Sequence, residues 1–171
     1  IDSLISSLTN NMTGGKNSTT IKNLRQDMAT LSFKPKTVVK RLLTSLPTRA
    51  RDVLNRRYGL GENTKPMTLE AIGGEYNITR ERVRQIENHA LDGVRASAAY
   101  KAEQESFDSL SSLIDTLGGL VSEEEFLAYV SGDVSTQNHI NFMLTVVEQF
   151  SREKEDESFH HRLYVNRDLS K

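Results

Sequence analysis

The stretch NITRERVRQIENHALDGVR, residues 77–95, decides the fold that we expect for the middle of the chain. In a helix, its apolar residues share one side, and most of its charged and amide residues share the other. The apolar set is Val83, Ile86, Ala90 and Val94. The opposite stripe, which begins near Arg80, is Glu81, Arg84, Gln85 and Asn88. We therefore expect one side of this helix to pack and the other to face a partner.

A shorter helix is expected directly before this one, over LEAIGGEY, residues 69–76. Thr68 and Thr79 stand where N-cap residues of the two helices would stand. Asn77 tolerates the left-handed backbone of a tight turn. Two helices joined by a three-residue turn, the second longer and more basic, predict a helix-turn-helix.

Two further helices are expected upstream. Pro35 and Pro47 suit the first turn of a helix, and Gly59 and Gly61 suit the end of the second one. Downstream, the residues after Val94 favour a long helix or a helical linker, because they are rich in Ala, Glu and Lys.

The charged residues are not evenly spread along the chain. Residues 34–101 hold 14 Lys and Arg against 7 Asp and Glu, whereas residues 102–171 hold 5 against 14. We therefore expect a basic helix-turn-helix domain over 34–101 and an acidic domain over 102–171. Residues 1–33 are expected to be a helical or flexible segment, because they contain a cluster of Asn, Thr, Gly and Ser.

The acidic part is expected to contain three helices followed by a β-hairpin, which is the element order of a winged helix. The fold class is therefore mainly α, with a small β-hairpin. The stretch REKEDES in the expected hairpin is mostly acidic, so phosphate would repel it, and we expect this part to contact protein. His160 and His161 are interpreted as surface residues of a strand and not as metal ligands.

The polar stripe is chemically suited to the edges of base pairs. Arg can donate to guanine O6 and N7, Gln or Asn can pair with adenine, and Glu can accept from cytosine. The major groove admits one α-helix, so the stripe could read sequence there. The alternative is a solvated surface helix with ordinary ion pairs.

Residues 46–95, from LPTRARDVLNRRYGLG to the end of TRERVRQIENHALDGVR, resemble the fourth conserved region of bacterial primary sigma factors. That region reads the upstream promoter hexamer and packs on the flap of the β subunit of RNA polymerase. The resemblance covers about 50 of 171 residues. Gly74 departs from the polar helix former usual in the family, and glycine inside a helix costs about 1 kcal/mol relative to alanine.

The resemblance implies roles for particular residues. Together with the stripe, it gives the expected base contacts, which are Arg80, Glu81, Arg84, Gln85 and Asn88. The expected phosphate contacts are Arg49, Arg57, Thr68 and Arg82. The chain has no Trp and no aromatic-basic segment like the one that melts promoters, so we do not expect these residues to open a promoter as a complete sigma factor does.

The acidic part resembles the HARE-type winged helix of the δ subunit of some bacterial RNA polymerases. The expected function is therefore that of a bacterial transcription factor that reads a promoter-like duplex through residues 80–91. Its acidic part would contact RNA polymerase or another protein. The alternative is an accessory or anti-sigma-like protein that binds polymerase, or another regulator, without reading DNA.

Other classes of function have little support in the sequence. The chain has no Cys, and no stretch approaches the roughly 18 apolar residues of a membrane span. No catalytic constellation, phosphate-binding loop or metal motif stands out, so we expect no enzyme activity, cofactor, metal or small-molecule substrate. A cytoplasmic protein of the bacterial nucleoid fits these features.

Overall fold

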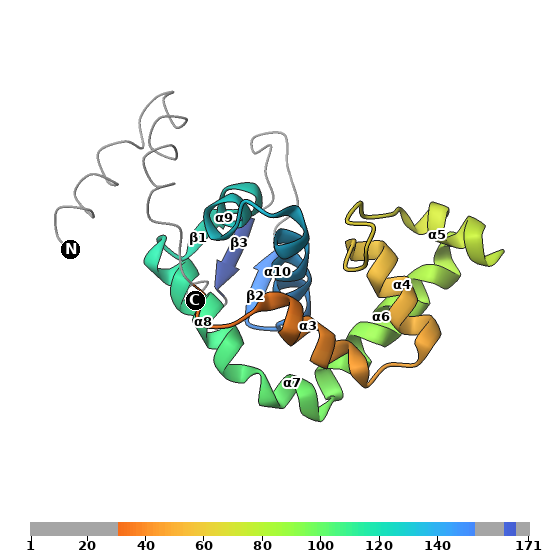
Figure 1. Cartoon of the computed structure of the whole chain (residues 1–171), viewed down its shortest axis with the longest axis horizontal. Helices are drawn as coiled ribbons and strands as arrows, with labels where there is room; N and C mark the ends of the chain where they lie inside the picture. Colours follow the sequence, from red (N-terminus) through yellow and green to blue (C-terminus); the bar gives the residue numbers. More distant parts are fainter. Residues whose placement is uncertain (1–30, 153–162, 167–171) are drawn as a thin grey trace, which may run out of the picture.

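The computed structural model of the chain is mainly helical, with one small sheet, and it describes residues 31–152 and 163–166 (Figure 1). Nearly all of the expected segment 1–33, together with His160 and His161, lies outside the described residues. Leu31 and Phe33 are described, and both pack against the main hydrophobic core.

The first two described helices are α3, Pro35–Thr44, and α4, Thr48–Tyr58. Pro35 occupies the first turn of α3, as expected, and α4 begins one residue after Pro47. Gly59 ends α4 in the left-handed conformation, with φ of 63°. The sequence therefore predicted the positions of these helices and the residue that ends the second one.

The helix-turn-helix consists of α5, Leu69–Tyr76, and α6, Arg80–Ala96. The hydroxyl of Thr68 accepts from the backbone N–H of Ala71, and that of Thr79 accepts from the N–H of Arg82. Asn77 turns the chain between the helices with φ of 52°. These features confirm the predicted helix-turn-helix.

The turn between the two helices approaches α5 closely at Gly73. A Cβ atom there would lie 2.7 Å from the carbonyl oxygen of Ile78, whereas one at Gly74 would meet nothing within 4 Å. Glycine is therefore required at the first of these positions and not at the second. Gly74, the departure from the family pattern, sits in open space.

The long helix stops at Ser97, which has extended backbone and caps a short helix, α7, Ala98–Ala102. The Ser97 hydroxyl accepts from the N–H of Tyr100. An uninterrupted helix is thus excluded, and the connection to the acidic part is a helical linker.

The acidic part contains α8, Gln104–Thr116, α9, Glu123–Val130, and α10, Val134–Val146. Its strands are β1, Leu120–Ser122, β2, Phe150–Arg152, and β3, Leu163–Asn166. The strand order is β1-β3-β2, and both pairings are antiparallel. The expected three helices are present, β2 and β3 pair, and β1 is a strand that the sequence did not predict. The stretch between β2 and β3 lies outside the described residues, so the wing stays a prediction.

One hydrophobic core runs across the boundary between residues 101 and 102. Helix α10 packs against α3, and it also contacts α4 and α6 (Figure 1). The core contains Leu42 of α3, Leu54 of α4 and Val94 of α6 together with Phe107 and Phe142 of the acidic part. A second, smaller cluster of Val53, Ile72 and Val83 joins α4, α5 and α6. The basic part, residues 34–101, and the acidic part, residues 102–171, therefore share buried apolar residues, and their division into two domains stays a prediction.

Candidate nucleic-acid interface

The five side chains expected to contact bases all reach the surface on the outer side of α6. We call this set the reading face, and its members are Arg80, Glu81, Arg84, Gln85 and Asn88. The opposite side of the helix buries Val83, Ala90 and Val94 to 1% exposure or less. The reading face is therefore held outward by the apolar residues behind it, and none of the described residues of the acidic part covers it.

Ion pairs organise the first two turns of the reading face. Arg84 donates to both carboxylate oxygens of Glu81, from Nε at 2.8 Å and from Nη2 at 2.7 Å. These hydrogen bonds hold the pKa of the Glu81 carboxyl below its usual range, and the same bonds raise the pKa of Arg84. Both groups are therefore charged at neutral pH and are aligned before any partner arrives.

Neighbouring side chains continue this arrangement. Arg82 Nη1 donates to Gln85 Oε1 at 3.0 Å, and Arg80 Nη1 lies 3.0 Å from a carboxylate oxygen of Glu70 on α5. The Arg80–Glu70 pair therefore links the two helices of the helix-turn-helix at the surface. Such exposed ion pairs contribute little to stability, because water and salt screen them.

The expected phosphate contacts are in different environments. Arg49 lies over the ring of Tyr76, with its Cζ 5.2 Å from the ring centroid, and Arg82 is exposed on α6. Thr68 is exposed, and its hydroxyl caps α5. Arg57 differs, because its Nη1 donates to the carbonyl oxygen of Met67 at 3.0 Å.

Glu87 is one of the residues whose role the sequence analysis missed. It is 8% exposed, its carboxylate accepts from the Tyr58 hydroxyl at 3.1 Å, and Arg57 Nε lies 3.5 Å away. Ile86, which was expected in the buried stripe, is only partly buried. The spacing contained the signal, because Glu87 stands four residues after Val83 and three before Ala90, and a buried carboxylate needs partners.

A second network, also missed, joins α4 to α5. The Tyr76 hydroxyl and Arg56 both donate to Asp52, and Arg56 also pairs with Glu75. Burial raises the pKa of Asp52, but the hydrogen bonds from Tyr76 and Arg56 outweigh it, so that the pKa lies below its ordinary value. This network fixes the first helix of the helix-turn-helix on its support.

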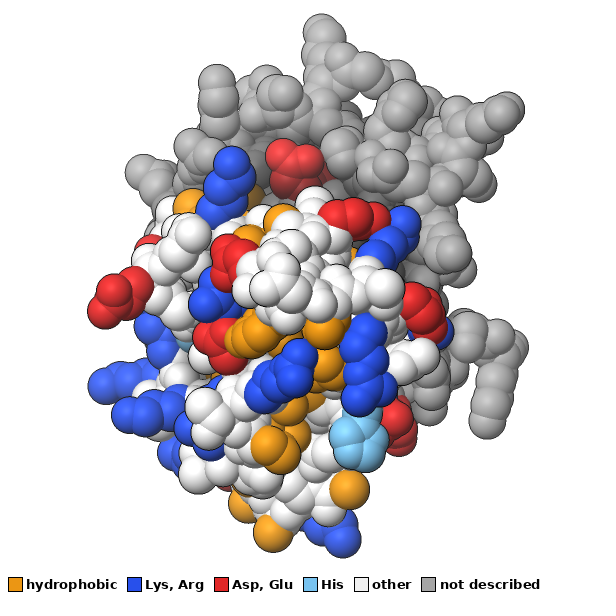
Figure 2. Space-filling model, turned by 90° about the vertical axis from the view of Figure 1, so that its right-hand side faces the viewer, with side chains coloured by type: hydrophobic (Ala, Val, Ile, Leu, Met, Phe, Trp, Pro, Cys, Tyr) orange, Lys and Arg blue, Asp and Glu red, His pale blue; other side chains and the backbone are white. Residues whose placement is uncertain are grey.

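The surface formed by α4, α5 and α6 is rich in charge. Figure 2 shows this end of the molecule, where many Lys and Arg side chains reach the surface with Asp and Glu side chains between some of them. A mixed surface of this kind has the donors that phosphates need and both the donors and acceptors that base edges need.

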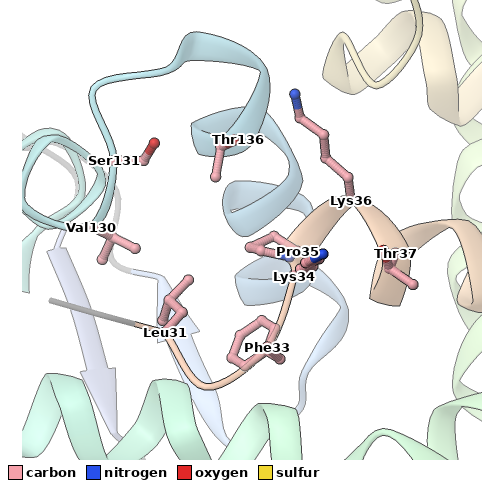
Figure 3. A pocket seen from close by; sticks show the side chains of 9 residues that line it. All are labelled: Leu31, Phe33, Lys34, Pro35, Lys36, Thr37, Val130, Ser131 and Thr136. Atoms are coloured by element: carbon pink, nitrogen blue, oxygen red, sulfur yellow. The ribbon is translucent and has the colours of Figure 1, made fainter.

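A groove of about 480 Å³ lies elsewhere, between residues 31–37 and the junction of α9 and α10. Figure 3 shows its apolar lining of Leu31, Phe33, Pro35 and Val130. It involves none of the reading face. In the described part of the chain, no group of three or more His, Asp or Glu could hold a metal ion, and no helix is long and apolar enough to cross a membrane.

The middle of the chain is similar in sequence to known proteins. Residues 42–96 match the family model of Sigma-70, region 4. RNA polymerase sigma factor SigA of Nostoc sp. is 51% identical over 57 residues, which are 33% of this chain and 14% of that protein. RNA polymerase sigma factor SigA1 of Synechococcus elongatus is 52% identical over 54 residues, 32% of this chain and 13% of the relative.

RNA polymerase sigma factor RpoD of Helicobacter pylori is more distant, at 43% identity over 61 residues, 36% of this chain and 9% of that protein. The chain therefore spans between 9% and 14% of the length of these relatives. The matched segment contains α4, α5, α6 and the whole reading face.

Proposed function

We propose that this chain is a sequence-specific DNA-binding protein of bacterial transcription, in which α6 enters the major groove of a promoter-like duplex. The proposal rests on one observation. The segment that matches Sigma-70 region 4 is also the segment that presents five exposed polar side chains on one side of the second helix of a helix-turn-helix.

The reading face supplies the chemistry for this role. Arg84 and Glu81 lie side by side, so their donors and acceptors could turn from each other to guanine and cytosine edges. Gln85 and Asn88 could pair with adenine further along the helix. Phosphate contacts would position the helix, and they would come from Arg49, Thr68 and Arg82. Arg57 would add a contact if its guanidinium released the carbonyl oxygen of Met67.

Binding to two duplexes of equal length and composition tests the proposal. One duplex carries a sigma-type upstream hexamer and the other carries the same bases scrambled, and both are titrated at physiological salt. We expect the hexamer duplex to bind at least about tenfold more tightly. Equal dissociation constants for the two duplexes would contradict sequence-specific reading.

We also propose that the segment similar to Sigma-70 region 4 packs on the β flap of RNA polymerase, and that the acidic part contacts polymerase or another protein. The helices and strands of the acidic part follow the order α8, β1, α9, α10, β2, β3, which supports a winged helix, and the sequence resemblance suggests the HARE type. Glu124 and Glu125, in the first turn of α9, are exposed, and phosphate would repel their charge. Retention of purified polymerase on the immobilised chain, at physiological salt, is the measurement.

The second candidate function is an accessory or anti-sigma-like protein that binds polymerase without reading DNA. The observation that favours it is the pairing of the reading face within the chain, in which Glu81 already binds Arg84. The variant Arg84→Ala/Gln85→Ala distinguishes the two functions. Polymerase retention by this variant, with no hexamer preference in the unmodified chain, would favour the second candidate.

A further inference from the structure

The side chain of Asn138 crosses from the acidic part to the basic part. It lies on α10, and its Nδ2 donates to the carbonyl oxygens of Gly59 at 3.0 Å and of Thr64 at 2.7 Å. These partners are 79 and 74 residues away in sequence. A single amide of the acidic part therefore binds two points of one loop, residues 59–67, which joins α4 to α5.

The loop is folded tightly around this amide. Gly59 has φ of 63°, and a Cβ atom there would lie 2.5 Å from the Thr64 carbonyl oxygen and 2.8 Å from Asn138 Nδ2. The other end of the loop is also held, because the N–H of Met67 donates to the carbonyl oxygen of Arg56. The Asn138 amide thus holds the carbonyl groups of Gly59 and Thr64 close together.

Helix α10 is itself held firmly against the basic part. Arg95 of α6 donates to the carbonyl oxygens of Val146 and Thr145 at the end of α10. The rings of Tyr58 and Phe142 meet edge to face, with 5.2 Å between their centroids. These contacts fix the position from which the Asn138 amide reaches the loop.

The loop leads directly to groups that would meet DNA phosphates. It carries Lys65, which is exposed, and it is followed by Thr68, the cap of α5 and an expected phosphate contact. A loop that samples many conformations would lose entropy when its residues become fixed on a phosphate. Holding it in one conformation beforehand would remove part of that cost.

We propose that Asn138 is a positioning residue for DNA binding, through which the acidic part orders the loop 59–67 without touching the duplex. This inference rests on the proposed function, because it assumes that the basic part binds DNA. It also gives the acidic part a role in affinity that its net charge would not suggest.

Two substitutions in the full chain test the inference. Asn138→Asp keeps the size of the side chain but sets a carboxylate against two carbonyl oxygens, and Asn138→Ala removes the amide. Gln137→Ala is the matched control, because the neighbouring Gln137 amide donates to Ser131 within the acidic part. Every variant is measured at a temperature at which circular dichroism shows it to be folded.

We expect both Asn138 variants to bind the hexamer duplex and the scrambled duplex about three- to tenfold more weakly, with Asn138→Asp the weaker. The ratio between the two duplexes should stay unchanged, because no base contact is lost. The slope of log affinity against log salt should become shallower, as it does when a phosphate contact weakens. Amide hydrogen exchange of residues 60–67 should accelerate, whereas the Gln137→Ala chain should match the unmodified chain in each measurement.

The outcomes separate the two proposals. Unchanged affinity and salt dependence in folded Asn138→Asp would overturn the positioning role, as would an equal loss in Gln137→Ala. An unmodified chain that binds both duplexes equally would overturn sequence-specific reading, and the positioning role would still be judged by the loss shared by the two duplexes. A chain that binds neither duplex would overturn both.

Discussion

The buried side and the outer side of α6 differ in exposure and in what they contribute to stability. On the buried side, Val83 and Val94 are 0% exposed and lie in clusters that join several helices. On the outer side, the Arg80 and Arg84 side chains are 69% and 51% exposed and pair with carboxylates in water. Burial contributes most of the stability of such a helix, whereas screened surface pairs contribute little. Substitutions on the two sides should therefore separate folding from recognition.

The largest effect is expected on the buried side, where Leu54 of α4 lies in the same core as Ala90 and Val94 of α6. Leu54 is 0% exposed, so Leu54→Ala should lower the free energy of unfolding by about 2–5 kcal/mol. Urea denaturation followed by circular dichroism measures this. A loss below about 1 kcal/mol would show that the core is not packed as described.

Glu87 tests whether a charged residue can belong to the buried side. Glu87→Ala leaves the Tyr58 hydroxyl and the nearby Arg57 without their carboxylate, so the free energy of unfolding should fall by about 1–3 kcal/mol. Glu87→Gln keeps an acceptor for Tyr58 and should lose less. If both variants were as stable as the unmodified chain, the carboxylate would have no structural role.

At Arg84, on the outer side, we expect the opposite result: recognition is lost and stability is kept. Arg84→Ala removes an exposed pair and a base-reading fork, so the preference for the hexamer duplex should fall about tenfold while the melting temperature barely changes. Arg84→Lys is the control, because it keeps the charge but cannot form two parallel hydrogen bonds. Full hexamer preference in Arg84→Ala would exclude this residue from base reading.

Arg49 gives a cleaner test of phosphate contact than Arg57 does. Arg49 lies over Tyr76 at the surface, whereas Arg57 also holds the Met67 carbonyl oxygen, so its loss would disturb the fold. Arg49→Ala should weaken both duplexes equally and reduce the slope of log affinity against log salt by about one. A change in hexamer preference would instead assign Arg49 to base reading.

The smallest expected effect is a pH dependence of stability that comes from Asp133 in the acidic part. Hydrogen bonds from Thr136 and Lys36 lower the pKa of Asp133 from 3.8 to about 2. A carboxylate with a lowered pKa stabilises the fold above pH 3.8, and this contribution is lost as the pH falls toward about 2. Melting temperatures of the unmodified chain and Asp133→Asn should therefore converge over this interval. A constant difference between them would contradict the assignment.

Local features of the fold were predictable, and contacts between distant residues were not. The caps at Thr68 and Thr79 and the left-handed turn at Asn77 follow from residues close in sequence. The bridge from Asn138 to Gly59 depends on the packing of α10, which no local pattern encodes.

The candidate site divides in the same way. The outward direction of the reading face follows from helical spacing, because the apolar residues behind it repeat at three and four positions. Glu87 was missed because a Glu usually faces solvent, and its partners Tyr58 and Arg57 come from α4. Helical spacing alone indicated that Glu87 faces inward, but its partners could be identified only once α4 and α6 were placed side by side.

The shared core across residues 101 and 102 also bears on how such a chain could be divided. A cut at that point would leave Leu42 and Val94 on one fragment and Phe107 and Phe142 on the other, each without its buried neighbours. Exposed apolar surface of that kind promotes aggregation. Transplanting residues 42–96 into another protein would therefore require a new cover for that surface, and a chimera would succeed only where its host supplied one.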